Sequence, residues 1–160
     1  MDRLRETDAR DLCTKAYELQ MIGKLDEAAS MYKRSIELHP TAEAHTFLGW
    51  TLGFMGRYEE AIAECKRAIK IDPEFGNPWN DIGAYLIELG KEEEAVPYLE
   101  RATIATRYDG HVFPHYNLSR VFLKKGMLQR AMEELQKALE ADPEYLPARQ
   151  ALAEIEIQLQ

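Results

Sequence analysis

Histidines, cysteines and a run of glutamates are the residues of this chain that could carry out chemistry. His111 and His115 lie four residues apart, a spacing that places two imidazoles on one helix face and could begin a zinc site. Pro114 lies between them, and no third or fourth ligand stands nearby at a fixed spacing. We therefore expect no metal site, and we expect chelators to leave stability and partner binding unchanged.

Nucleophilic and acid–base chemistry has no better support. Cys13 and Cys65 form no CxxC pair, and nothing close in the sequence marks either thiol as a nucleophile. The run at 92–94 is three glutamates, a pattern that favours the start of a helix, where negative charge meets free backbone amides. No glycine-rich phosphate loop follows a strand. The sequence predicts no catalytic residue, no cofactor and no enzymatic activity.

The composition excludes several classes of partner. The chain has 160 residues with 28 acidic and 20 basic side chains, a formal net charge of -8. Nucleic acids and anionic membranes select basic surfaces, so we expect neither as a partner. Because the sequence has no membrane-length apolar run, no signal-peptide core and only two cysteines, it predicts a cytoplasmic protein.

A six-residue motif that starts with glycine and ends with alanine recurs four times. Its copies begin at Gly23, Gly56, Gly90 and Gly126. Steps of 33, 34 and 36 residues separate the closing alanines, which are Ala28, Ala61, Ala95 and Ala131. These steps bracket the period of about 34 residues of one helical-hairpin repeat.

Each residue type in the repeat has a structural reason. Glycine permits a left-handed turn between two helices, and the small alanine lets the helices cross closely. Proline ends the second helix because it cannot continue the hydrogen-bond ladder. We therefore expect four helical hairpins and no sheet, with helices at residues 8–22, 25–38, 42–55, 58–71, 77–89, 92–106, 114–125 and 128–141.

These features resemble the tetratricopeptide-repeat family over about residues 9–143, followed by a helix that resembles its capping helix. The third copy carries the packing pattern of the family in Trp79, Ile82, Gly83, Leu86, Ala95, Leu99 and Ala102. The resemblance implies an all-α, right-handed superhelical solenoid of antiparallel helix hairpins. It also implies one domain over residues 1–160, with repeats at about 9–41, 42–75, 76–109 and 112–145 and a cap at about 145–159.

Three positions bear on how well the chain follows this pattern. Trp79 is expected to be buried between hairpins. Pro97 falls inside the second helix of the third repeat and predicts a kink or a late helix start. The connection at 107–112 is longer than the others and lacks the proline that ends the other repeats.

In the family, the first helix of every hairpin lines a concave groove. Phe47, Trp50 and Phe54 recur at spacings of three and four, so they share a helix face that the packing residues do not use. The resemblance also implies that two asparagines hold an extended peptide backbone, because a carboxamide both donates and accepts hydrogen bonds. The residues expected to bind the ligand are Tyr17, Phe47, Trp50, Phe54, Asn80, Tyr116, Asn117 and Arg120.

The groove composition separates two modes of binding in the family. Members that hold the C-terminal carboxylate of chaperones use a set of lysine, asparagine and arginine. The corresponding positions here are Arg10, Thr14, Phe47, Asn77 and Asp81. The carboxylate clamp is therefore absent, and an internal apolar segment is the expected ligand.

Three functions remain open on the sequence. The first is a scaffold or adaptor that binds an apolar or aromatic peptide or helix of another protein in the groove. The second is a chaperone of the bacterial secretion type, which shields a hydrophobic segment of its cargo. The third is a structural protein that associates with copies of itself into a homo-oligomer. A cargo protein that is unstable alone would distinguish the second from the first, and light scattering would detect the third.

Overall fold

The computed structural model describes all 160 residues. It contains nine α-helices, joined by short connections, and no strand. Two backbone segments, at Phe75 and Arg107, form a single isolated parallel bridge. The all-α solenoid predicted from the repeat is thus confirmed. The helices are α1 (Asp2–Met21), α2 (Leu25–Leu38), α3 (Ala42–Phe54), α4 (Tyr58–Ile71), α5 (Gly76–Glu88), α6 (Glu92–Thr103), α7 (Val112–Lys124), α8 (Leu128–Ala141) and α9 (Leu146–Gln158).

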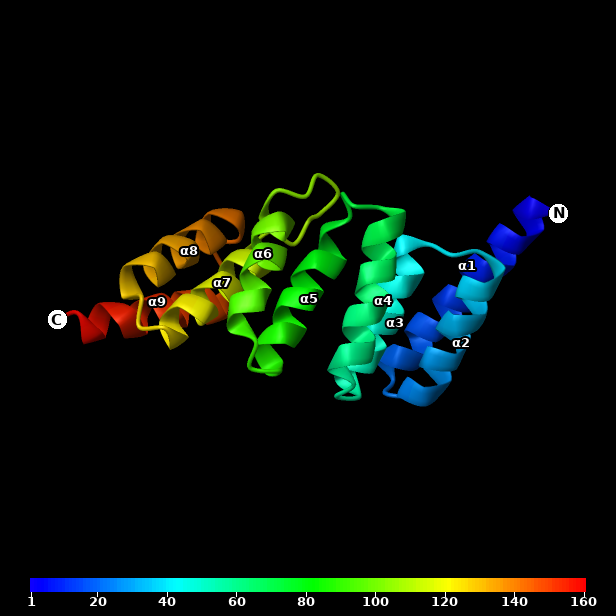
Figure 1. Ribbon diagram of the computed structural model, residues 1–160, viewed down its shortest axis with the longest axis horizontal. Helices are drawn as coiled ribbons and strands as arrows, with labels where there is room; N and C mark the ends of the chain where they lie inside the picture. Colours follow the sequence, from blue (N-terminus) through cyan, green and yellow to red (C-terminus); the bar gives the residue numbers. More distant parts are fainter.

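The helices form antiparallel pairs that stack side by side. Helices α1 with α2, α3 with α4, α5 with α6 and α7 with α8 pack as hairpins, and α9 packs on α8. Figure 1 shows the resulting elongated array, with the two ends of the chain at opposite ends of the stack. The odd-numbered helices also contact one another from hairpin to hairpin, so α1, α3, α5 and α7 form one continuous layer.

Glycine and alanine perform the roles that the motif predicts. The four motif glycines are the only residues of the chain with a positive φ, between 71° and 82°. At the first of these turns, the amide of Lys24 donates to the carbonyl of Leu19 at 2.9 Å and closes the end of the helix. The four motif alanines are fully buried, because each lies where its two helices cross.

One apolar core runs the length of the stack. It extends from Ala16 in α1 to Ile155 in α9 without dividing into separate clusters. Leu99 of α6 is fully buried at the centre, and a Cβ added to Gly83 of α5 would lie only 2.3 Å from its side chain. Each hairpin therefore covers the apolar face of the next, as expected of a repeat that cannot bury its own surface alone.

Some boundaries differ from those predicted. Helix α1 starts at Asp2 instead of residue 8, because Asp2–Asp8 contains no helix breaker and the helix continues beyond the first repeat. Helix α6 ends at Thr103 instead of residue 106, and α7 starts at Val112, ahead of Pro114. Proline is well tolerated in a first helical turn, so Pro114 does not delay the start of α7.

Of the two alternatives predicted for Pro97, a kink or a late helix start, the late start is wrong. Helix α6 begins at Glu92 and contains Pro97 as its sixth residue. The backbone bond that proline removes would have ended on the carbonyl of Glu93, which lies in the exposed first turn of the helix. Water can bind that carbonyl, so the helix starts normally.

Trp79 is half-buried, and the prediction that it would be buried between hairpins is corrected. Its ring lies 5.9 Å from that of Tyr98, and the guanidinium of Arg101 lies 5.3 Å from the ring centre. The indole Nε1 donates to the carbonyl of Pro73 at 2.9 Å. The ring therefore bridges the two helices of its own hairpin, with one edge at the surface.

No helix combines the length and apolarity that a membrane crossing requires.

Candidate functional site

Aromatic side chains from two neighbouring hairpins meet on the layer formed by the odd-numbered helices. The ring of Tyr17 on α1 packs edge-on against Phe47 on α3, with 5.8 Å between the ring centres. Tyr32 of α2 stacks on Phe47 at 6.0 Å and is fully buried. The ring centres of Trp50 and Phe54, both on α3, lie 5.1 Å apart. Three of the predicted ligand-binding aromatics thus follow one another along α3, with Tyr17 beside them.

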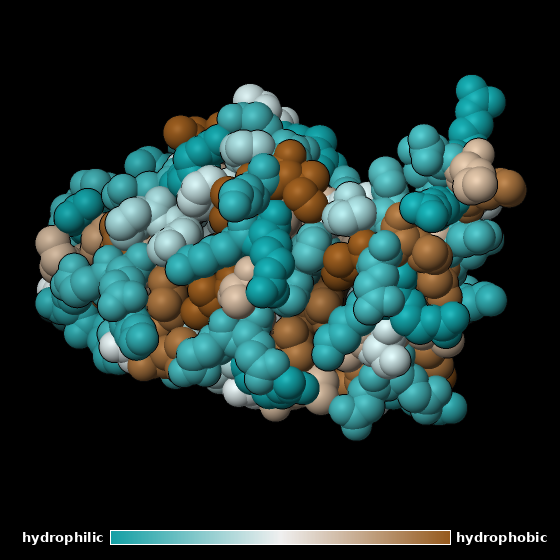
Figure 2. All heavy atoms as spheres, turned by 45° about the vertical axis from the view of Figure 1, so that its right-hand side comes forward, coloured by the Kyte–Doolittle hydropathy of each residue, from teal (hydrophilic) through white to brown (hydrophobic).

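These rings remain open to solvent on one side. Tyr17 is 41% exposed and Phe54 is 60% exposed, whereas Phe47 and Trp50 are half-buried. On the face drawn in Figure 2, apolar atoms form patches between ridges of polar side chains. Exposed aromatic groups that line a concave surface are typical of a site for a partner.

A cavity of about 390 Å³, here called the aromatic basin, opens beside these rings. A second cavity of about 850 Å³, the polar basin, shares Trp50, Asn77 and Asp81 with the first, so the two form one groove along α3 and α5. The aromatic basin is otherwise lined by Tyr17, Thr46 and Phe47. The polar basin is otherwise lined by Phe75, Asn80, Thr106, Arg107, Tyr108, Asp109, Gly110 and Phe113.

The long connection between α6 and α7 forms the outer wall of the polar basin. These residues, 104–111, are called the strap. Figure 1 shows the strap leaving α6 and running beside the start of α5. There the amide of Gly76 donates to the carbonyl of Arg107 at 3.1 Å, and the amide of Arg107 donates to the carbonyl of Glu74 at 3.0 Å. Two backbone bonds therefore fasten the strap to the segment that precedes α5.

Side chains fasten the same segment further. The carboxylate of Glu74 accepts from the amide and hydroxyl of Thr106, at 3.0 and 2.9 Å. The guanidinium of Arg107 pairs with Asp72 at 2.7 Å and with Glu43, on the preceding hairpin, at 2.8 Å. These bonds from Arg107 and Thr106 lower the pKa values of Asp72 and Glu74 respectively. The strap thus connects the second and third hairpins across the rim of the groove.

The pKa shifts give the strap a predictable response to acid. The lowered pKa values mean that ionised Asp72 and Glu74 stabilise the fold at pH values above their unfolded pKa values. That stabilisation is lost as the pH falls through the folded pKa values. We expect the amide of Gly76 to lose hydrogen-exchange protection in acid before the helix cores do.

Replacing Gly76 with alanine is expected to release the strap. A Cβ at this position would lie 2.3 to 2.5 Å from Cβ and ring atoms of Tyr108, and the Cβ cannot rotate away. We expect the Arg107 amide to exchange at least about tenfold faster in hydrogen-exchange mass spectrometry, because its acceptor moves. Asn77→Ala, one residue along the helix, is the control. Unchanged protection in Gly76→Ala would show that the strap does not depend on this contact.

The two groove asparagines bind each other. The Nδ2 of Asn117 donates to the Oδ1 of Asn80 at 3.0 Å, and both side chains are buried. Arg120 donates to the Oδ1 of Asn117 at 3.1 Å and to Glu88 at 3.3 Å. This chain of bonds joins α5 to α7. Asn80 lines the polar basin, whereas Asn117 and Arg120 lie outside both basins.

Tyr116 lies toward the C-terminal end of the stack. Its ring packs edge-on against Tyr145 at 5.4 Å, and neither basin contains it. Phe113, one helical turn earlier, also packs against Tyr145 at 5.7 Å but is 44% exposed and lines the polar basin. The structure therefore brings together Tyr17, Phe47, Trp50 and Asn80 of the predicted set, and the other four lie beside the groove instead of in it.

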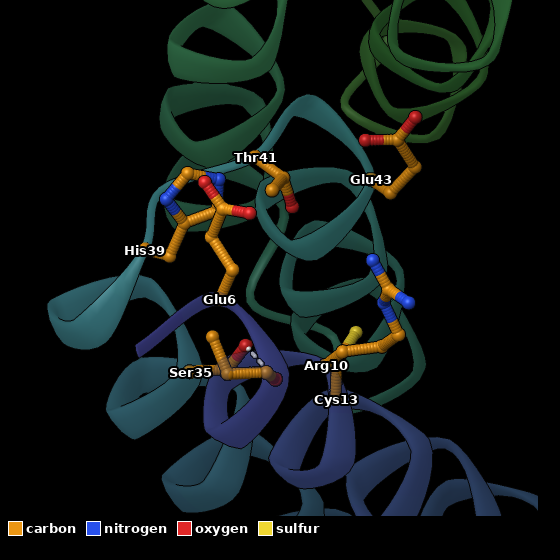
Figure 3. Close-up of a pocket in the computed structure, with 8 residues that line it drawn as sticks. Glu6, Arg10, Cys13, Ser35, His39, Thr41 and Glu43 are labelled. Carbon is orange, nitrogen blue, oxygen red and sulfur yellow. Dashed lines mark hydrogen bonds between the residues drawn. The ribbon is translucent and has the colours of Figure 1, made fainter. Parts of the chain in front are cut away.

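A separate cavity of about 400 Å³ lies where the first hairpin meets α3 (Figure 3). It contains Cys13 and His39, which the sequence separates widely. Figure 3 shows His39 beside Glu6 and Cys13 beside Arg10, without a hydrogen bond between the thiol and the imidazole. Burial, followed by the charge of Glu43, raises the pKa of Cys13, so the thiol is protonated at neutral pH. A protonated thiol without a base is a poor nucleophile.

Three of the four histidines bind partners within the protein. The Nδ1 atoms of His45 and His115 each lie 2.7 Å from a glutamate on the second helix of their own hairpin, Glu64 and Glu134 respectively. His111 instead faces the carbonyl of Ala105 at 3.1 Å. His111 and His115 therefore point to different partners, and no three His, Cys, Asp or Glu side chains in the structure are grouped to hold a metal ion.

Sequence reasoning missed the residues that reach the groove from outside the helices. Phe75, Arg107 and Tyr108 belong to connections between hairpins, which have no position in the repeat pattern. The missing proline and the extra residues after α6 were the signal that this connection has a different structure. The repeat register places Asp81 in the groove, but nothing in the sequence indicates that both basins share it.

Stacked helical hairpins with a groove along their first helices define a helical-repeat scaffold for protein interactions. Family models described as "Tetratricopeptide repeat" match residues 42–75, 77–103 and 112–145. The chain belongs to the tetratricopeptide-repeat family, whose members act as protein-interaction modules.

The chain matches parts of several longer curated proteins. The small glutamine-rich tetratricopeptide repeat-containing protein 2 of Mycosarcoma maydis is 35% identical over 43% of this chain and 20% of its own length. The TPR repeat-containing thioredoxin TTL4 of Arabidopsis thaliana is 32% identical over 48% of this chain and 11% of its own length. The BBSome complex member BBS4 of Bos taurus is 26% identical over 99% of this chain and 31% of its own length. The chain spans less than a third of each of these relatives.

Solved structures share the fold. PilW, a type IV pilus biogenesis factor, superposes with a TM-score of 0.84 at 19% identity, over 94% of this chain and 69% of that one. The pilF protein of Pseudomonas aeruginosa gives a TM-score of 0.80 at 23% identity, over 96% and 77%. At this identity the likeness concerns the fold alone.

Proposed function

We propose that the groove along α3 and α5 binds a segment of another protein that carries apolar or aromatic side chains, so that the chain acts as a scaffold or adaptor. The observation that supports this most directly is the row of aromatic rings beside the two basins. Tyr17, Phe47 and Trp50 come from two hairpins yet line one cavity, and Tyr17 remains 41% exposed. Exposing such rings has an energetic cost in water, which a partner would remove.

The polar residues of the groove support a peptide as the ligand. Asn77 lies in both basins, and Asn80 adds a second carboxamide in the polar basin. Carboxamides can pair with the N–H and C=O groups of a peptide backbone. The rings then supply pockets for side chains, and a few such anchors supply most of the binding energy at an interface.

Capture of partners by the purified chain tests the proposal. Wild type and Phe47→Ser/Trp50→Ser are immobilised at equal density, and proteins retained by wild type alone are identified by mass spectrometry. Synthetic peptides covering each retained protein are then titrated by calorimetry. We expect one apolar or aromatic segment to bind at 1:1 stoichiometry, and to bind the double variant at least about tenfold more weakly.

The remaining candidates are outcomes of the same experiment. A retained protein that aggregates without this chain and stays monomeric with it would identify a chaperone that shields a hydrophobic cargo. A concentration-dependent increase in mass in light scattering, lost in the double variant, would show that the groove binds another copy. Retention that is equal for wild type and the double variant would contradict binding in the groove.

A further inference from the structure

Asp81 is the one acidic side chain that both basins share. It lies on α5, one helical turn beyond Asn77, and part of its surface faces the groove. It forms no ion pair with any lysine, arginine or histidine of the chain, unlike Asp72, Glu43 and Glu74 at the rim. The groove therefore contains a carboxylate whose counter-charge the protein does not supply.

The one basic side chain that lines either basin is already paired. Arg107 lines the polar basin, but it pairs with Asp72 and Glu43, and it lies 4.2 Å above the ring centre of Phe75. Asp109 of the strap adds a second negative charge to the polar basin. The aromatic basin contains no charged residue apart from Asp81. The groove thus has a negative potential inside a chain of net charge -8.

The walls of the aromatic basin suit a cation with a long apolar stem. Tyr17, Phe47 and Trp50 surround the space beside Asp81. The faces of aromatic rings attract ammonium and guanidinium groups and also pack well against methylene chains. A neutral apolar side chain would leave the carboxylate buried without a partner, which is unfavourable.

We infer that the partner segment carries a lysine or arginine whose cationic head pairs with Asp81 and whose stem lies against Phe47 and Trp50 in the aromatic basin. This inference rests on the proposed function and specifies its ligand as an apolar segment with one basic residue. The carboxylate and the rings that would make these contacts already line the basin without a partner.

The ionisation of Asp81 supports this assignment. Burial raises its pKa to about 7, and the amide of Asn80 offsets part of that effect. Besides Tyr17, Arg107 and Asp109 of the basins, the charge of Asp81 reaches Cys65 of α4, Tyr85 of its own helix and Tyr108 of the strap. Burial raises the pKa of these last three above their ordinary alkaline values, so none of them titrates between pH 6 and 8. A cation that binds ionised Asp81 must therefore compete with a proton in this range.

The raised pKa also defines a control for folding. A carboxyl group whose folded pKa exceeds its unfolded value stabilises the fold below the unfolded pKa, and this stabilisation is lost as the pH rises through about 7. Asp81→Asn should therefore melt no lower than wild type at pH 8. A loss of binding in this variant then has a cause other than unfolding.

The test uses ten-residue synthetic peptides with a background of leucine, phenylalanine, serine and glycine and one variable central residue. Lysine, arginine, norleucine or glutamate occupies the centre, and binding to the full chain is measured by fluorescence anisotropy at pH 8 and pH 6. Asp81→Asn is the variant. Asp109→Asn is the matched control, because it removes the same charge from the polar basin only.

We expect wild type to bind the lysine and arginine peptides at least about tenfold more tightly than the norleucine peptide at pH 8. The preference should shrink several-fold at pH 6, disappear in Asp81→Asn and survive in Asp109→Asn. Equal binding of the lysine and norleucine peptides would overturn the inference and leave the proposed function intact. Binding of no peptide would contradict both, and an equal loss in the two variants would show that only net charge matters.

Discussion

Replacing Trp50 with alanine is expected to weaken the binding of the partner segment about 30-fold or more, roughly 2 kcal/mol. Trp50 lies where the two basins meet, beside Asn77 and Asp81, so any segment that passes along the groove must contact its ring. Large aromatic anchors of this kind supply much of the free energy of peptide binding. Calorimetric titration of a captured segment against wild type and variant measures the effect.

Trp79→Ala is the matched control for Trp50→Ala. Both changes remove a half-buried indole from an odd-numbered helix, but Trp79 packs against Tyr98 on the opposite side of its hairpin and lines neither basin. We expect its affinity for the segment to match that of wild type. If Trp50→Ala unfolds the protein as severely as Trp79→Ala does and its folded fraction binds normally, the aromatic rings belong to the core and the functional surface lies elsewhere.

Replacing Leu99 with alanine is expected to lower the free energy of unfolding by about 3 to 4 kcal/mol. The side chain of Leu99 is fully buried in α6 and contacts the glycine face of α5, where no neighbouring Cβ can move in to fill the space. The substitution therefore leaves a cavity in addition to removing apolar contacts. Urea denaturation of the full chain, followed by far-ultraviolet circular dichroism, measures the loss.

Trp79→Ala should lower the free energy of unfolding by about 2 to 3 kcal/mol, less than Leu99→Ala does. The cost is smaller because the indole is only half-buried. This order reverses the usual effect of side-chain size. A larger loss in Trp79→Ala would mean that its stacking on Tyr98 and its bond to Pro73 stabilise the hairpin more than core packing does.

The repeat is predictable from sequence because its residues act locally. Each hairpin of about 34 residues is specified by three local features. These are a glycine with positive φ at the turn, a small residue at the helix crossing and, in most repeats, a proline after the second helix. The eight helices of the four hairpins therefore follow from spacing, whereas the capping helix and the superhelical stacking are implied by the resemblance to the family. The register also predicts which helix face is free, and it placed Phe47 and Trp50 on the surface that becomes the aromatic basin.

The sequence did not determine what closes the groove or where its charge lies. Arg107 meets Glu43 across 64 positions of the chain, and Tyr108 covers Gly76 only because the strap folds back along α5. No periodicity specifies such contacts, since they join connections that lie outside the repeat. Similarly, whether Asn117 is free or bonded to Asn80, and whether Asp81 has an ion-pair partner, depends on the distance between neighbouring hairpins. Local residue preferences determine the hairpins, but only their packing in three dimensions decides which polar side chains remain available to a ligand.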